Sequence, residues 1–187
     1  MKVIAASFGT SGTIRSVRVS GDSTILRTGD PLFLADHLGE WTAEICPAVR
    51  LSRLGTNIPR KVAGRYFDSA ALVLIVSPAD PSAHPEGICG LLDRSVAPGE
   101  WFGEEVLSDG PTEISLSGPS GDSSDEISCL RSLIEDSVHE LSRYCTFKTG
   151  DLLLLRGLGP APADTLRPDT TINACLDGRQ ALRVRFK

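Results

Sequence analysis

Hydrophobic and polar positions along the chain follow mostly the period of a β-strand. Apolar residues occur in many short runs, and segments that contain glycine or proline separate these runs. Alternation of apolar and polar positions is typical of a half-buried strand, and an unbroken apolar run indicates a strand buried on both faces. The pattern predicts strands over residues 2–8, 13–19, 42–54 (a long strand or hairpin arm), 71–76, 113–117 and 152–155.

Two segments carry helix signals instead. Asn57-Ile58-Pro59 is typical of a helix start with proline in the first turn, and this helix is predicted to end near Asp68. Ser123 and Glu126 fit a capping box at the end of a polar loop. Behind them, apolar residues at helical spacing predict an amphipathic helix over 127–141.

The last local signals are a hairpin turn and a long irregular stretch. Asp177-Gly178 between two short strands predicts a type I′ turn. Residues 77–110 show little periodicity and are predicted to be mostly loop with short strands. With 187 residues, the chain is long enough to bury a core of its own. We therefore predict a β-rich α+β fold in a single domain, residues 1–187.

Composition and charge narrow the class of protein. Hydrophobic residues make up 41% and charged residues 23%, as in ordinary globular proteins. A net charge of −5 argues against a nucleic-acid or anionic-membrane surface. No apolar stretch fits a signal sequence or a membrane span, so a cytoplasmic protein is predicted. The five cysteines are odd in number and lack CxxC spacing, which favours reduced thiols over disulfides or a zinc site.

Two longer stretches resemble a known family. Residues 144–187 contain a Thr149-Gly150-Asp151 turn, a leucine strand and a Gly/Pro-rich loop, and residues 30–80 contain Arg53-Leu54-Gly55 before a helix and a buried strand. This order is similar to that of the fumarylacetoacetate hydrolase family, and with residues 113–143 the resemblance covers about three quarters of the chain. It implies mixed β-sheets rolled around a core, a few short helices, and a homodimer.

The resemblance also implies a particular chemistry. Members of the family act on 2-oxo or 1,3-dicarbonyl acids with Mg²⁺ or Mn²⁺, which is held by a Glu-x-Glu pair and a distal Asp. Alternate residues of a strand face the same way, so such a pair presents two hard oxygen ligands together. In this chain the pair falls at Glu44 and Cys46, and the distal Asp falls at Ile75. Glu44 is thus the vestigial metal ligand that the resemblance predicts.

Other functional positions of the family are also replaced. Its catalytic Lys falls near Gly90, where the chain has no lysine, and its N-terminal His and Glu have no counterpart. Its two loop threonines are replaced within Arg156-Gly157-Leu158-Gly159. We therefore predict a divergent member with impaired or absent catalysis and without a cofactor, or with Mg²⁺ or Mn²⁺ if an altered site persists. The alternatives are an active metal-dependent hydrolase, decarboxylase or isomerase of the acylpyruvate type, and a structural or regulatory partner of an active paralogue.

The candidate site residues each leave more than one interpretation open. Glu44 is either a metal ligand or a carboxylate that meets an arginine or water. Cys46 is a buried inert thiol, a nucleophile, or a zinc ligand together with Glu44 and His37 or His84. Arg156 binds a ligand carboxylate, such as that of a small dicarboxylate, or is ion-paired or solvated.

Overall fold

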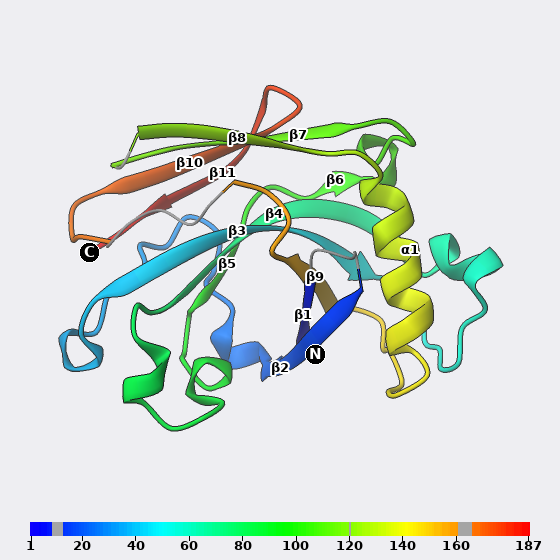
Figure 1. Cartoon of the computed structure of the whole chain (residues 1–187), viewed down its shortest axis with the longest axis horizontal. Helices are drawn as coiled ribbons and strands as arrows, with labels where there is room; N and C mark the ends of the chain where they lie inside the picture. Colours follow the sequence, from blue (N-terminus) through cyan, green and yellow to red (C-terminus); the bar gives the residue numbers. More distant parts are fainter. Residues whose placement is uncertain (9–12, 120, 161–165) are drawn as a thin grey trace.

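The computed structural model describes residues 1–8, 13–119, 121–160 and 166–187, which form two β-sheets stacked on one another with a helix at one side (Figure 1). The large sheet has seven strands in the order β2-β1-β9-β3-β4-β5, with β6 also paired to β4. Its strands are β1 (Lys2–Phe8), β2 (Ile14–Gly21), β3 (Trp41–Leu51), β4 (Phe67–Pro78), β5 (Val96–Pro98), β6 (Phe102–Gly103) and β9 (Leu152–Arg156).

The small sheet has four antiparallel strands in the order β11-β10-β7-β8. They are β7 (Thr112–Gly118), β8 (Gly121–Ile127), β10 (Thr171–Leu176) and β11 (Arg179–Arg185). In the large sheet β1 and β9 are parallel and the other pairs are antiparallel, so this sheet is mixed. The prediction of a β-rich α+β fold is confirmed.

The helices of the described residues are one α-helix and six short 3₁₀ segments. They are α1 (Leu130–Leu141), η1 (Asp22–Thr24), η2 (Asp36–Leu38), η3 (Arg60–Arg65), η4 (Pro81–Ala83), η5 (Ile88–Gly90) and η6 (Glu104–Val106). Among the described residues, no helix has the length and apolar content that crossing a membrane requires.

The helix predicted from Asn57 to Asp68 is wrong in type and extent. Only η3 forms there, and Phe67 already belongs to β4, where it pairs with Leu51. Gly64 lies inside the segment and lowers its helix propensity, because glycine loses the most backbone freedom on folding. Phe67 is only 3% exposed, so pairing and burial within the sheet compete with any longer helix.

The capping box at Ser123 and Glu126 is also wrong. Both residues lie in β8, opposite Leu116 and Glu113 of β7, and α1 begins only at Leu130. Pairing with β7 satisfies the backbone groups of this polar segment, which the loop prediction left without partners. The amphipathic face predicted behind the capping box is confirmed over the observed length of α1, where Leu130, Ile134, Val138 and Leu141 are buried.

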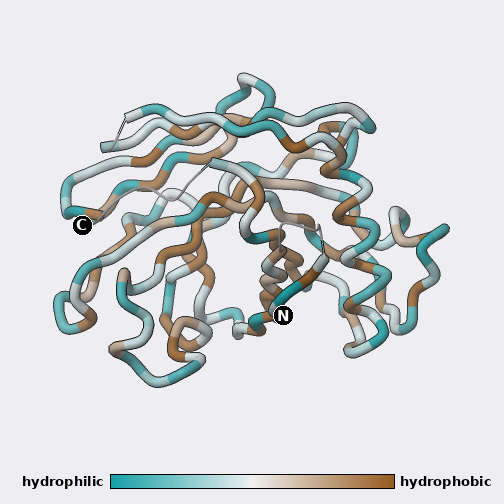
Figure 2. Tube along the Cα trace, in the orientation of Figure 1, coloured by the Kyte–Doolittle hydropathy of each residue, from teal (hydrophilic) through white to brown (hydrophobic). Residues whose placement is uncertain are grey.

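The central strands of the large sheet are rich in hydrophobic residues (Figure 2). Their side chains are buried on both faces of the sheet. One face contributes to the main core, which also contains the inner side chains of the small sheet and of α1. The other face carries a separate apolar group that we call the second-face cluster. Its members are Val3, Ala5, Cys46, Ala48, Val73, Ile75, Val96, Leu152 and Leu154. Residues at even positions of β3 therefore point toward the second face, as the strand period requires.

Two turns that the sequence predicted are confirmed. Gly150 has a φ of +88°, and Asp151 is 1% exposed with oxygens that accept hydrogen bonds from the backbone N–H of Lys2 and of Lys148, each at 2.9 Å. This turn joins the start of β9 to the start of β1. Asp177 and Gly178 have φ values of +49° and +74°, as the central residues of a type I′ turn require.

Candidate functional site

The second face of the large sheet brings together the positions where the family resemblance placed a metal. Glu44 and Cys46 are alternate residues of β3 and point to the same face. Glu44 pairs directly with Ile75 of β4, and Cys46 pairs with Val73. Ile75 and Cys46 both belong to the second-face cluster. The structure thus brings these three positions together at one location, although only Glu44 carries a carboxylate.

The carboxylate of Glu44 is bound within the chain. Arg156, at the end of β9, donates from Nε at 2.8 Å and from Nη2 at 2.6 Å to Glu44 Oε2, and the backbone N–H of Gly157 donates to Oε1 at 2.8 Å. The two side chains are only 17% and 21% exposed. Charge-assisted hydrogen bonds of this kind are about twice as strong as neutral ones. Of the interpretations left open for Glu44, the structure shows the carboxylate that meets an arginine.

Cys46 lies behind this ion pair and is 0% exposed. Burial raises the pKa of its thiol well above the ordinary value, and the neighbouring Glu44 raises it further, whereas Arg156 and Arg18 act in the opposite direction. The raised pKa disfavours the thiolate, which is the form that acts as a nucleophile or a metal ligand. The structure favours the interpretation of Cys46 as an inert buried thiol.

Arg18 joins the site from β2 and was not predicted from the sequence. It pairs with Ala5 of β1, which pairs with Leu154 of β9, so Arg18 faces the same side of the sheet as the second-face cluster. Its side chain is half-buried. Burial and the Arg156 guanidinium lower the pKa of Arg18, while Cys89, Glu44 and Cys46 raise it. The alternating polar positions Ser16 and Arg18 on the strand predicted over residues 13–19 were the available signal.

Gly90 lies next to Arg18, at the end of η5. A Cβ atom at this glycine would lie 3.4 Å from the Val19 carbonyl oxygen, 3.5 Å from Ser20 Oγ and 3.7 Å from Arg18 Cδ. These distances are ordinary van der Waals contacts. The position where the resemblance expects a lysine is therefore buried against β2, and the cation at this place comes from Arg18.

The donor set does not fit Mg²⁺ or Mn²⁺, which prefer several oxygen ligands. Glu44 has committed both oxygens, Cys46 is a protonated thiol and Ile75 is apolar. The described residues contain no group of three or more His, Cys, Asp or Glu side chains that could hold a metal ion. His37 and His84 line a separate cavity of about 340 Å³ without Glu44 or Cys46, which speaks against the zinc interpretation.

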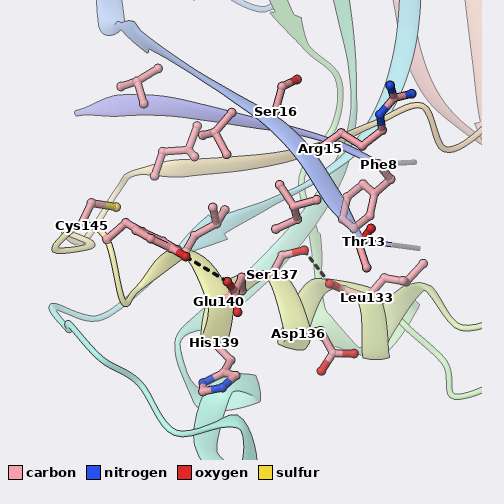
Figure 3. A pocket seen from close by; sticks show the side chains of 16 residues that line it. Phe8, Thr13, Arg15, Ser16, Leu133, Asp136, Ser137, His139, Glu140 and Cys145 are labelled. Carbon is pink, nitrogen blue, oxygen red and sulfur yellow. Dashed lines mark hydrogen bonds between the residues drawn. The ribbon is translucent and has the colours of Figure 1, made fainter. Parts of the chain in front are cut away.

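A wide cavity lies elsewhere, between β2 and α1 (Figure 3). It has a volume of about 890 Å³, and Ile4, Val17 and Val19 line it from the face opposite to Arg18. Ser137 donates to the Leu133 carbonyl at 2.7 Å, and His139 Nδ1 lies 2.7 Å from the Ile58 carbonyl oxygen. These polar groups are engaged with backbone carbonyls, and the cavity contains none of the candidate site residues.

The architecture matches solved structures across the whole chain. A fumarylacetoacetate hydrolase family protein from Yersinia pestis has a TM-score of 0.81 at 14% identity, over 100% of this chain and 92% of its own. Fumarylpyruvate hydrolase from Pseudomonas aeruginosa, in complex with Mn²⁺ and pyruvate, has a TM-score of 0.80 at 19% identity, over 100% and 89%. 2-Hydroxyhepta-2,4-diene-1,7-dioate isomerase from Mycobacterium marinum has a TM-score of 0.83 at 15% identity, over 99% of this chain and 73% of its own.

These similarities define the class of fold. The chain has the fold of fumarylacetoacetate hydrolase family proteins, so the resemblance predicted from residues 30–80 and 144–187 is confirmed at the level of the fold. The sequence itself matches no family model and no curated protein. With identities below 20%, the shared fold alone is shown, and the chemistry has to be argued from the residues of this chain.

Proposed function

We propose that this chain is a divergent member of the fumarylacetoacetate hydrolase family that binds a small carboxylic acid without a catalytic metal. The observation that carries this proposal is the Glu44–Arg156 ion pair. A metal ion that used Glu44 would have to displace two guanidinium hydrogen bonds and one backbone N–H. It would gain no second carboxylate in return, since Cys46 and Ile75 stand at the other expected positions. The chain is then a pseudoenzyme for the metal-assisted reaction.

A second candidate function is an active metal-dependent hydrolase, decarboxylase or isomerase of small 2-oxo or 1,3-dicarbonyl acids. The neighbours in fold favour it, because they are hydrolases and isomerases and one of them holds Mn²⁺ and pyruvate. This candidate requires that metal and substrate together rearrange the Glu44–Arg156 pair. A third role, a regulatory or structural partner of an active paralogue, also uses an inactive scaffold.

Unfolding temperature distinguishes the first two candidates. The protein is titrated with Mg²⁺ and with Mn²⁺, each with and without oxalate, after treatment with a chelator. A ligand at about 100 times its dissociation constant stabilises the folded state by about 2.7 kcal/mol, which raises the Tm of a domain of this size by roughly 5 to 10 °C. We expect no shift with either metal alone and no increase of the oxalate shift when metal is added.

The outcome that contradicts the proposal is metal-dependent turnover of an acylpyruvate or oxaloacetate that Glu44→Ala abolishes. Glu40→Ala is the matched control, because Glu40 is an exposed glutamate that lies four residues earlier and just before β3. Loss of turnover in both variants would indicate a general effect of the substitution on the strand, and loss in Glu44→Ala alone would restore the enzyme interpretation.

We further propose a cytoplasmic homodimer. The outermost strand of the large sheet, β2, exposes Val17 and Val19 at 45% and 58%, beside the cavity that α1 borders. An outer strand with apolar side chains offers backbone groups and apolar surface for a second copy of the chain. A sedimentation measurement that finds only monomer at high concentration would contradict this assembly.

A further inference from the structure

We propose that the guanidinium of Arg18 anchors the carboxylate of a small organic acid in the site beside Glu44 and Arg156. This inference rests on the proposed function, since it names the residue and the ligand group of the same site. It assigns the role to a residue on β2, whereas the family resemblance pointed to β3, β4 and the loop after β9.

The position of Arg18 follows from strand register. Arg18 pairs with Ala5 and Ala5 pairs with Leu154, and both partners belong to the second-face cluster. Arg156 lies two residues beyond Leu154 on β9, so it points to the same face. The two guanidinium groups and the Glu44 carboxylate are therefore neighbours on one face, as their mutual electrostatic effects also indicate.

The charges at this place do not balance. Arg18 and Arg156 supply two positive charges and Glu44 one negative charge, which Arg156 already binds. Within the part of the chain that the structure describes, no carboxylate makes an ion pair or hydrogen bond with Arg18. Among the described residues, the site therefore carries one more positive than negative charge, in a chain whose net charge is −5. A bound anion would supply a charged partner to the half-buried guanidinium of Arg18.

Partial burial of the Arg18 guanidinium favours the binding of an anion. A guanidinium carries five N–H donors and stays protonated at neutral pH, so it must keep its charge where water is limited. Burial and Arg156 both lower the pKa of Arg18, which shows that its charged form is disfavoured by its surroundings. A carboxylate would accept two parallel N–H bonds from the planar fork and would offset both effects.

Gly90 leaves room for the Arg18 side chain. The nearest side-chain atom of Arg18 to a Cβ at this position would be Cδ, at 3.7 Å. A Cβ at position 90 would thus make an ordinary contact with the stem of Arg18, and a larger side chain at this position would crowd its surroundings.

Glu44 limits which anions fit. Its negative charge lies close enough to raise the pKa of Arg18, so it also repels an anion at that guanidinium. A dianion such as phosphate suffers this repulsion about twice, whereas a single carboxylate suffers it once. We infer that the ligand presents one carboxylate to Arg18, with any second acidic group directed away from Glu44.

The test is calorimetric titration of the full chain with pyruvate, with oxalate and with inorganic phosphate, in metal-free buffer with chelator. The wild-type protein is expected to bind pyruvate more tightly than phosphate. Arg18→Gln should weaken pyruvate binding about 10- to 100-fold, because one charge-assisted, two-point contact is lost. The pyruvate affinity of Arg18→Lys should lie between those of the wild type and Arg18→Gln, because lysine keeps the positive charge but cannot donate two parallel hydrogen bonds from a planar group.

The matched control is Arg15→Gln. Arg15 lies three residues earlier on the same strand, is exposed and lines the cavity on the opposite face. Arg15→Gln removes the same charge from the protein as Arg18→Gln. The pyruvate affinity of Arg15→Gln should stay within about twofold of wild type, because an exposed charge is screened by solvent and salt. Gly90→Leu serves as a second variant that keeps Arg18 and should weaken pyruvate binding by crowding it.

The possible results distinguish a failure of the role proposed for Arg18 from a failure of the proposed function. Pyruvate binding to wild type that Arg18→Gln and Gly90→Leu leave unchanged overturns the role of Arg18 and leaves the proposed function standing. An equal loss in Arg15→Gln and Arg18→Gln reduces the effect to net charge and also overturns it. Phosphate that binds as tightly as pyruvate overturns the preference for a carboxylate. Absence of any acid binding to wild type overturns the proposed function together with this inference.

Discussion

The two ends of β9 each hold a carboxylate contact between distant segments, and the two contacts differ in what surrounds them. At the start of β9, Asp151 is 1% exposed and accepts backbone N–H groups from Lys2 and Lys148. At the end of β9, Arg156 holds Glu44, which is 17% exposed and keeps a boundary with solvent. The first contact belongs to the turn that ties β1 to β9. The second stands where the resemblance expected a metal, so it links the same strand to a site.

The two contacts depend on different parts of the chain, one on backbone groups and the other on side chains. The Asp151 contact depends on the backbone N–H groups of Lys2 and Lys148 and on the turn at Gly150 and Asp151, and on no partner side chain. The Glu44 contact depends on a side chain, Arg156, that replaces a threonine of the resembled loop. The fold therefore keeps its turn while the neighbouring site exchanges its partners, and the two contacts should respond differently to substitution.

The largest effect is expected for Asp151→Ala. Two backbone N–H donors lose a charged acceptor in a buried turn, and hydrogen bonds to charged groups contribute about 1.5 to 3 kcal/mol each. We expect the free energy of unfolding to fall by about 3 to 4 kcal/mol, measured by urea denaturation with a common m-value. Lys2→Met is the control, because it keeps the backbone N–H of Lys2 and removes two side-chain contacts of Nζ, the partly exposed ion pair with Asp151 at 3.6 Å and the exposed hydrogen bond to the Thr146 carbonyl at 2.6 Å. It should cost about 1 kcal/mol or less. Equal losses in the two variants would contradict the structural role of the turn.

A smaller effect is expected at the other end of β9. A double-mutant cycle with Glu44→Gln and Arg156→Met should give a coupling free energy of about 1 to 2 kcal/mol, since both side chains are mostly buried and the pair shares two hydrogen bonds. Urea denaturation of the four proteins measures it. The control cycle uses Glu140 and Arg143, an exposed pair on α1 at 3.4 Å that should couple by less than about 0.5 kcal/mol. Coupling of the same size in both cycles would mean that Glu44–Arg156 is an ordinary surface pair.

Much of the fold could be predicted from the sequence because its signals are local. The leucine run of β9 and the apolar run inside β4 mark strands buried on both faces, and the Asp177-Gly178 dipeptide marks a turn whose φ values are positive. The polar strand β8 was not predicted, because Gly121–Ile127 has no apolar residue before its last position. Its strand state comes from pairing with β7, which is a tertiary contact that no local pattern carries.

The site could be predicted only in part. The spacing of Glu44 and Cys46 predicts that both lie on one face, and the strand register pairs Glu44 with Ile75, the position that the resemblance singled out. Glu44 and Arg156 are 112 residues apart in sequence, so their pairing depends on β3 and β9 lying side by side in the folded sheet. Arg18 was not predicted as a site residue for the same reason, since its neighbours Ala5 and Gly90 come from β1 and η5.

The smallest expected effect concerns Cys46, which lies behind the Glu44–Arg156 pair. Burial and then Glu44 raise the pKa of this thiol above its ordinary value of 9.0, although Arg156 and Arg18 oppose the shift. Below pH 9 the thiol is protonated in both the folded and the unfolded chain, so its full contribution to stability is present there. As the pH rises further, the unfolded chain loses this proton first and the contribution is lost, by at most about 1.4 kcal/mol per pH unit.

The measurement is the difference in unfolding free energy between wild type and Cys46→Val from pH 8 to pH 10. Valine fills a similar volume and has no proton to lose, so we expect the difference to move against the wild type by about 1 kcal/mol over this range. Peptide mapping after alkylation provides the accessibility control, in which the exposed Cys129 reacts in the folded protein and Cys46 reacts only after unfolding. A constant difference across the range would mean that the Cys46 thiol ionises as readily in the folded chain as in the unfolded one. Water would then reach the second face behind Glu44, and the site would be more open than its apolar cluster indicates.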